Sequence, residues 1–304
     1  MRNAFAQEIT KIAAQNENLV LLAGDIGNRL FDDFKEKNPA RFYNCGIAEA
    51  LMTGVASGLA NNSFLPVTYT ITPFNTLRCL EQIKLDVCYP NLPVTIVGTG
   101  SGLSYASLGA THHSLDDIAA MRMLPNMQIL APGDIYEVIG CLRAAIDSKK
   151  PTYIRLGKKG EPVVHSKEFT YEIGKVIPVY KGQKNLVISV GNMLSECDQA
   201  IKKFEAKYNF LPELVSIGSV NPLDEEYLKN SFEKFEKIIV AEEHGFIGGA
   251  GAAILEWAYT NNQSVRKLKL INTPKEFIIG GGNQANVRKQ LHLDADSIFA
   301  IMKE

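Results

Sequence analysis

One carboxylate in this sequence lies where a charge is costly. Glu49 follows Asn44-Cys45-Gly46-Ile47-Ala48, and the helix that it is predicted to begin continues with small and apolar residues to Ala60. An acid in the first turn of a helix ordinarily serves the helix dipole. These neighbours are too apolar for a solvated side chain, however, and a buried carboxylate needs a hydrogen-bond donor. We therefore expect Glu49 to be buried against a specific donor, inside a domain or at a subunit interface.

Two other groups of residues have the types required for chemistry. His112 and His113 precede Asp116 and Asp117, which could suggest a metal site. Adjacent histidines point in different directions, and no third ligand has a telling spacing, so we predict no metal ligands. Arg155 ends a predicted strand, and ligands bind at the carboxyl ends of parallel strands. An anion-binding role and a plain surface charge both remain open for this arginine.

Composition bounds the class of protein. A chain of 304 residues suits two domains of ordinary size. Its net charge of -1 gives no reason to expect nucleic acid or an anionic membrane surface as a partner. No apolar run is long enough to span a bilayer, and the N-terminus is not typical of a signal peptide. The five cysteines form no C-x-x-C pair, so we predict neither zinc nor disulfides and expect a cytoplasmic protein.

Short β-branched strands alternate with longer helices, which predicts two consecutive open α/β domains with mainly parallel sheets. We place the first domain at 1–160, a linker at 161–180 and the second domain at 181–304. The predicted strands are 19–23, 41–44, 66–70, 93–98, 127–131, 152–156, 185–191, 213–217 and 237–241. The predicted helices are 3–16, the Glu49 helix, 74–88, 115–123, 135–148, 194–208 and one that follows Gly248-Gly249-Ala250-Gly251.

Several motifs, taken in order, resemble one family. The chain resembles the C-terminal half of a transketolase and, more closely, the separate C-terminal subunit of a split, two-subunit transketolase. The motifs are Arg2-Asn3-Ala4, Gly24-Asp25-Ile26-Gly27, Asn44 to Glu49, Phe74 with Arg78, Gly109-Ala110-Thr111-His112-His113, Tyr153-Ile154-Arg155-Leu156, and Val240 to His244. The resemblance covers essentially the whole chain and implies a pyrimidine-binding domain followed by a transketolase C-terminal domain.

The resemblance implies a thiamine diphosphate enzyme that transfers a two-carbon ketol unit from a ketose to an aldose. In such enzymes the residue matching Glu49 hydrogen-bonds a ring nitrogen of the aminopyrimidine. That bond favours the imino tautomer, which removes the proton from the thiazolium carbon. His112 matches a catalytic histidine that contacts oxygens of the donor sugar, a task that suits imidazole near neutral pH.

Further cofactor contacts follow from the same resemblance. Phe74 matches the aromatic residue that packs on the aminopyrimidine, although an ordinary core phenylalanine is the alternative. Tyr69, on the preceding strand, is expected to line the same pocket. Asp25 matches an acid near the cofactor, but an aspartate that simply forms a turn is equally consistent with the sequence.

Substrate contacts are implied at four positions, and one residue departs from the family pattern. Arg155 and Arg2 match arginines that bind the phosphate of sugar-phosphate substrates, and His112 contacts the donor sugar. His113 stands where the family often has glutamine and is expected to tune specificity. Leu108 replaces the usual aspartate that reads a substrate hydroxyl, which puts the common pentose phosphates in doubt. A modified, deoxy or less common sugar remains open.

The chain has no Gly-Asp-Gly followed by a distant Asn, the family motif that binds the diphosphate through Mg²⁺. The resemblance therefore implies a partner chain that carries this motif and the Mg²⁺. The chain alone should be inactive, and the expected assembly is a dimer of heterodimers.

Three alternatives remain open. The first is the beta subunit of a 2-oxoacid dehydrogenase, although Thr111-His112-His113 and the start of the domain at Arg2 favour ketol transfer. The second is an enzyme resembling deoxyxylulose-phosphate synthase, which is normally one longer chain. The third is a non-catalytic partner subunit, and the presence of Glu49, Phe74 and His112 argues against it.

Overall fold

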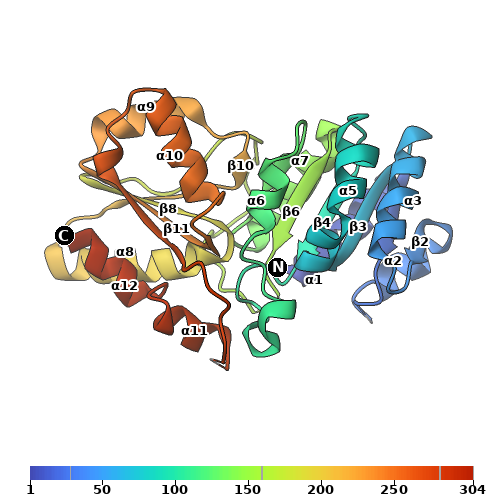
Figure 1. Cartoon of the computed structure of the whole chain (residues 1–304), viewed down its shortest axis with the longest axis horizontal. Coiled ribbons are helices and arrows are strands. Elements are labelled where there is room, and N and C mark those ends of the chain that lie inside the picture. Colours follow the sequence, from blue (N-terminus) through green and yellow to red (C-terminus); the bar gives the residue numbers. More distant parts are fainter. Residues whose placement is uncertain (28, 159, 281, 304) are drawn as a thin grey trace.

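The computed structural model describes residues 1–27, 29–158, 160–280 and 282–303 and contains two α/β units side by side (Figure 1). The first sheet has the strand order β10-β5-β6-β4-β3-β1-β2. The first six strands along the chain belong to it: β1 (Leu19–Ala23), β2 (Phe42–Asn44), β3 (Leu65–Ile71), β4 (Thr95–Thr99), β5 (Gln128–Leu130) and β6 (Thr152–Leu156). These six strands pair in parallel.

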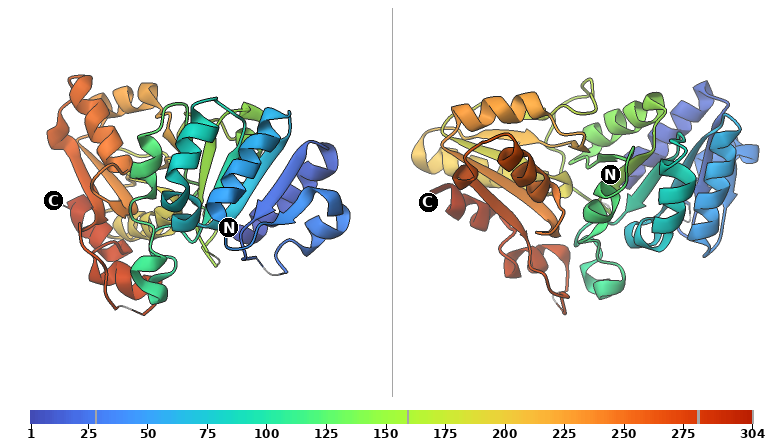
Figure 2. Two further views of the ribbon diagram at one scale, coloured as in Figure 1. Left: turned by 45° about the vertical axis from the view of Figure 1, so that its right-hand side comes forward. Right: turned by 45° about the horizontal axis from the view of Figure 1, so that its top comes forward.

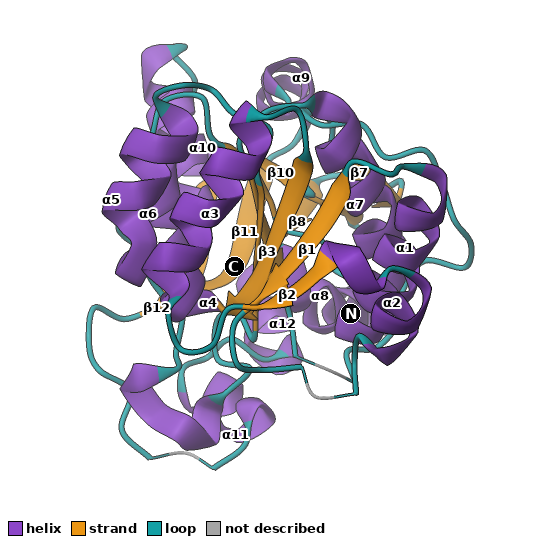
Figure 3. Ribbon diagram, turned by 90° about the vertical axis from the view of Figure 1, so that its right-hand side faces the viewer, coloured by secondary structure: helices purple, strands orange, loops and turns teal. Residues whose placement is uncertain are grey.

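Helices cover both faces of this sheet because its central strands are apolar on both sides; β1, β4 and β6 are buried at every position. The helices α1 (Arg2–Gln15), α2 (Asp32–Lys37) and α7 (Ile135–Ser148) pack on one face. The helices α3 (Glu49–Asn61), α5 (Leu80–Gln82) and α6 (Asp117–Arg122) pack on the other, as Figure 3 shows.

The second sheet has the order β12-β11-β8-β9-β7, and only β7 runs antiparallel to its neighbour. Its strands are β7 (Ile177–Tyr180), β8 (Asn185–Ser189), β9 (Glu213–Ser216), β11 (Lys237–Gly245) and β12 (Leu268–Thr273). Its helices are α8 (Leu194–Tyr208), α9 (Glu225–Lys234), α10 (Ala250–Thr260), α11 (Gln284–Gln290) and α12 (Ala295–Lys303). The two mostly parallel sheets confirm the predicted fold class.

The two halves share a sheet. Strand β10 (Ser219–Asn221) comes from the second half of the chain but pairs antiparallel with β5 of the first sheet (Figure 1). The predicted linker, 161–180, includes β7 of the second sheet. The division at 160 and 181 therefore describes which sheet each half mainly builds, and it remains a prediction as a domain boundary.

The helix predicted over 74–88 is broken into short turns. It consists of α4 (Thr72–Asn75), a 3-10 turn over Leu77–Cys79, α5 and a π-helical turn over Ile83–Cys88. The buried Asn75 amide donates to the carbonyl oxygen of Val97 at 3.0 Å, which anchors the first turn to β4. The following Thr76 has non-helical backbone angles. The break lets Phe74 and Arg78 project from separate turns at the end of the sheet.

Two further views of the molecule show that its helices are short and lie against the sheets (Figure 2). Across the residues that the structure describes, no helix has the length and apolar character needed to cross a membrane.

Candidate active site

The predicted site residues follow the strands of the first sheet at their carboxyl ends. Asp25 follows β1, Glu49 follows β2 and Phe74 follows β3. Because β1 pairs with both β2 and β3, the chain changes direction across the sheet between β1 and β3. Open parallel sheets bind ligands at such switch points.

Glu49 is the first residue of α3, and it is only 5 % exposed. The Arg78 guanidinium donates from Nη1 to Glu49 Oε2 at 2.9 Å, and the Arg78 side chain is 46 % exposed. The expected burial of this carboxylate against a specific donor is therefore confirmed. The donor comes from the broken segment that follows β3, which sequence spacing alone could not place beside α3.

An aromatic ring lies next to this ion pair. The Arg78 guanidinium carbon lies over the Phe74 ring, 4.2 Å from its centroid. The His112 ring meets the Phe74 ring edge-on, with centroids 5.3 Å apart. Phe74 is half-buried, so part of its surface is open. The structure thus brings Glu49, Phe74 and His112 together, with Arg78 between the first two.

His112 ends a loop that follows β4 and contains a 3-10 turn over Ala106–Thr111. Its Nδ1 lies 2.9 Å from the Thr111 hydroxyl, and its ring meets Tyr105 edge-on at 5.9 Å. Burial, and then the neighbouring His113, lower the pKa of His112. The imidazole is therefore neutral near pH 7 and can donate or accept a hydrogen bond.

Two cations lie near Tyr105. The Lys158 Nζ is 4.6 Å from the centroid of the Tyr105 ring. The positive charge of Arg2 acts on Tyr105 and favours its ionised form, although burial raises the pKa of Tyr105 overall. Arg2 Nε is buried and has no hydrogen-bond partner among the described residues. Sequence reasoning passed over Lys158, although the rule that selected Arg155 at the end of β6 applies equally three residues later.

Arg155 lies elsewhere than we predicted. Its side chain is buried, and its Nε donates to Asp117 Oδ2 at 2.7 Å. Its Nη2 donates to the carbonyl oxygens of Ser114 and Glu243, at 2.9 and 2.8 Å. A phosphate would have to displace these protein acceptors in a closed space. The geometry favours a structural role for Arg155 between the two halves of the chain.

Tyr69 and Asp25 differ in exposure. The Tyr69 ring is 1 % exposed, stacks on Phe5 at 5.3 Å and meets Phe31 edge-on at 4.9 Å. It is therefore sealed in the core, and burial raises the pKa of its hydroxyl. Asp25 is exposed and accepts a hydrogen bond from the Asn44 amide at 3.3 Å. It remains accessible at the edge where Glu49 lies.

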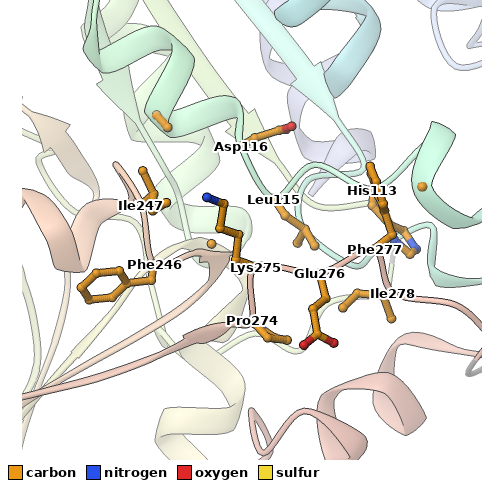
Figure 4. Close-up of a pocket in the computed structure, with 13 residues that line it drawn as sticks. His113, Leu115, Asp116, Phe246, Ile247, Pro274, Lys275, Glu276, Phe277 and Ile278 are labelled. Carbon is orange, nitrogen blue, oxygen red and sulfur yellow. The ribbon is translucent and has the colours of Figure 1, made fainter.

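His113 faces away from His112, as expected for adjacent histidines. It is buried, and its Nε2 lies 3.2 Å from the carbonyl oxygen of Ala106. It lines a cavity of about 490 Å³ between the two halves, together with apolar residues such as Phe246, Ile247 and Phe277 (Figure 4). Its predicted effect on specificity remains untested. Leu108 is half exposed on the loop before His112.

Among the described residues, a group with donors close enough together for a metal ion is Asp134, Glu137 and His165. Asp134 caps α7 through the Tyr136 and Glu137 amides, and its Oδ2 also accepts from the backbone and Nδ1 of His165. Burial raises the pKa of Glu137 to about 7. Despite its own burial, His165 has a raised pKa because Asp134 and Glu137 face it. A proton on His165 accounts for this cluster without a metal.

Comparison with known proteins decides the family. The family description "Transketolase, pyrimidine binding domain" matches residues 1–161, and "Transketolase, C-terminal domain" matches 174–298. The chain belongs to the transketolase family. One of the two subunits of the apulose-4-phosphate transketolase from Phocaeicola vulgatus is 31 % identical to this transketolase chain, over 98 % of this chain and 94 % of its own length.

Two other relatives bracket the resemblance. A solved structure described as a split gene transketolase, inactive beta4 tetramer, superposes with a TM-score of 0.88 at 29 % identity and covers 99 % of this chain and 96 % of that one. The 1-deoxy-D-xylulose-5-phosphate synthase of Syntrophus aciditrophicus is 32 % identical over 98 % of this chain but only 46 % of its own length. The predicted family is thus confirmed, and it is one of thiamine diphosphate enzymes.

Proposed function

We propose that this chain is the C-terminal subunit of a split transketolase that transfers a two-carbon ketol unit from a ketose to an aldose. The observation that carries the proposal is the buried Glu49 carboxylate beside the open Phe74 ring at the switch point of the first sheet. Thiamine diphosphate, when bound, supplies the carbon nucleophile and the electron sink for this chemistry. Glu49 would accept a hydrogen bond from the protonated ring nitrogen of the aminopyrimidine, and His112 would contact oxygens of the sugar.

The residues present fit the pyrimidine end of the cofactor and not its diphosphate end. Glu49 supplies a carboxylate in a dry site, where a hydrogen bond to a ring nitrogen is strong. Phe74 supplies an aromatic face. The sequence has no Gly-Asp-Gly motif with a following Asn. In this proposal, Mg²⁺ and the diphosphate therefore belong to a partner chain, and the chain described here supplies no metal ligand.

An unpaired apolar face supports the need for a partner. Ile47 just before α3, with Leu51 and Val55 on it, is 81, 65 and 41 % exposed, although the opposite face of α3 is in the core. A Cβ added at Gly54 or Gly58 of the same helix would meet nothing within 4 Å. Glycine costs about 1 kcal/mol in a helix interior. Glycines beside exposed apolar residues suit close packing of another chain, next to Glu49.

We further propose that the substrate carries an anionic group. Arg2 and Lys158 lie near Tyr105, beside His112, and Arg2 has a buried nitrogen without a partner among the described residues. A phosphorylated ketose would place its phosphate at these cations and its carbonyl near His112. The name of the Phocaeicola relative, which includes a sugar 4-phosphate, agrees with this class. Leu108, in place of aspartate, suits a donor that lacks the usual hydroxyl.

The test is co-expression with the partner chain, followed by assay with thiamine diphosphate, Mg²⁺ and a panel of ketose donors. We expect ketol transfer by the complex and none by this chain alone, in keeping with the solved relative described as an inactive beta4 tetramer. Release of a two-carbon unit from no ketose in the panel, by a complex that binds the cofactor, would reject the proposed reaction.

The similarity to deoxyxylulose-phosphate synthases favours a second candidate. Such an enzyme would condense pyruvate with an aldose phosphate and release carbon dioxide. The same complex assayed with pyruvate and an aldose phosphate discriminates between the two reactions, because only this candidate releases carbon dioxide.

A further inference from the structure

Arg78 lies in an unusual position between two groups of the proposed cofactor site. Its Nη1 donates to Glu49 Oε2 at 2.9 Å, and its guanidinium carbon lies 4.2 Å from the centroid of the Phe74 ring. The guanidinium is planar, cationic and rich in N–H donors. It therefore offers Glu49 a hydrogen-bond donor and offers Phe74 a flat face to stack on.

The aminopyrimidine of thiamine diphosphate would require the same two contacts. This statement rests on the proposed function, in which Glu49 accepts from the ring nitrogen and Phe74 packs on the ring. A protonated aminopyrimidine is also planar and also donates N–H groups. One carboxylate oxygen and one face of a phenyl ring cannot hold both groups in the same space.

We infer that Arg78 is a place-holder for the aminopyrimidine, occupying its carboxylate and its aromatic face until the cofactor binds. The place-holder solves a physical problem of the separate chain. Glu49 is 5 % exposed, and a buried carboxylate without a donor would destabilise the chain. The Arg78 side chain is 46 % exposed, so it can swing into solvent without breaking the core.

Displacement of Arg78 lowers the affinity for the cofactor, because each binding event must first break the ion pair. It also frees a guanidinium at the mouth of the site when the cofactor arrives. Phe74 and His112 keep their edge-on contact meanwhile, so the displaced group is Arg78 alone.

The chain provides a matched control for the loss of an arginine. Arg143 is also 46 % exposed, and its Nε donates at 2.6 Å to Glu8, whose side chain is 3 % exposed. Arg143→Gln therefore removes an equivalent pair far from the proposed site. Both Arg78→Gln and Arg143→Gln should lower the unfolding temperature of the isolated chain.

The decisive measurement is the thiamine diphosphate affinity of the complex with the partner chain, at saturating Mg²⁺, by titration calorimetry. We expect Arg78→Gln to bind the cofactor about threefold more tightly than wild type, the fold-change of an ion pair open to water on one side. Arg143→Gln should bind as wild type does. Equal or weaker binding by Arg78→Gln would overturn the inference.

Crystal structures of the wild-type complex with and without cofactor give a second test that needs no variant. We expect the Arg78–Glu49 pair in the cofactor-free complex and its absence in the loaded one; a pair that persists in the loaded complex contradicts the place-holder. A wild-type complex that binds no thiamine diphosphate is a different result, since it overturns the proposed function itself.

Discussion

Glu49 and Glu8 are both nearly buried glutamates paired with a half-exposed arginine, yet their surroundings differ. Glu8 lies in the middle of α1 and pairs with Lys11 and Arg143. Glu49 lies at the carboxyl edge of a parallel sheet, beside a half-exposed phenylalanine and a neutral histidine. Burial of a charge therefore does not by itself indicate chemistry, and the neighbouring groups decide it.

At this scale the first prediction is the effect of Glu49→Gln. A neutral amide cannot stabilise the protonated aminopyrimidine, so turnover of the partnered complex should fall about a hundredfold or more. Glu8→Gln is the matched control and should leave turnover near wild type. Circular dichroism should show both variants folded. A Glu49→Gln complex with near-normal turnover would disprove the assigned role.

At the scale of single elements, α3 joins the core to an open surface. Met52, Ala56 and Ala60 lie in the core, whereas Leu51 and Val55 face outward. An amphipathic helix has a polar outer face in a monomer. The apolar outer face of α3 is therefore the surface that we expect the partner chain to cover.

The second prediction follows from this face. Leu51→Asp should leave the isolated chain folded, since the side chain is exposed, but should reduce co-purification with the partner by about tenfold or more, on the order of a hot-spot loss. Val163→Asp alters a residue of the predicted linker that is 51 % exposed and should not affect assembly. Equal co-purification of both variants would remove α3 from the interface.

The amino end of α7 gives a prediction about pH. Burial raises the pKa of Glu137 to about 7, above its ordinary value of 4.5. The folded state then binds more protons than the unfolded state between these values, so stability falls as pH rises through this window. His165 acts in the same direction, because its raised pKa gives stability that is lost at higher pH.

Glu137→Gln removes the first contribution. Relative to wild type, this variant should therefore be more stable at pH 8 than at pH 5, by a difference on the order of 3 kcal/mol at most. Urea unfolding at the two pH values measures the difference. A difference of the opposite sign would show that Glu137 is charged in the fold at pH 5.

Elements with strong local patterns were predictable from sequence, and those set by distant contacts were not. The bounds of α7, β6 and α8 agree with the predicted helices and strand because capping and periodicity are local signals. The helix expected over 74–88 breaks because Asn75 bonds to Val97 of another strand. Strand β10 is too short for a pattern and exists through its pairing with β5.

The same division applies to the candidate site. The burial of Glu49 could be predicted, because apolar neighbours surround it in the sequence. Its donor, Arg78, and the pairing of Arg155 with Asp117 depend on segments brought together by the fold. A strand-end arginine looked suitable for phosphate until Asp117 was found against it.

At the scale of the whole molecule, buried charges join the two halves. Arg155 of β6 donates to Asp117 and to the backbone of Glu243 in β11. The Glu243 carboxylate in turn accepts from the Leu103 amide of the first half at 3.0 Å and from Arg288 of the second. These contacts and strand β10 make each half part of the other's structure.

We therefore predict that the halves unfold together. The single tryptophan, Trp257, lies on α10 and reports on the second half, whereas helical circular dichroism reports on both. Urea transitions followed by the two signals should coincide. Asp117→Asn, which leaves the buried Arg155 poorly paired, should shift both by about 3 kcal/mol or more. Two separate transitions would show that the halves fold independently.

The most direct test of the central claim, that this chain holds the pyrimidine end of a cofactor whose other end belongs to a partner, is one calorimetric titration. Thiamine diphosphate with Mg²⁺ is added to this chain alone and to its complex with the partner chain. We predict saturable binding of one cofactor per copy of this chain in the complex, and no measurable binding to the chain alone. Absence of binding to the complex, or full-affinity binding by the isolated chain, would contradict the account.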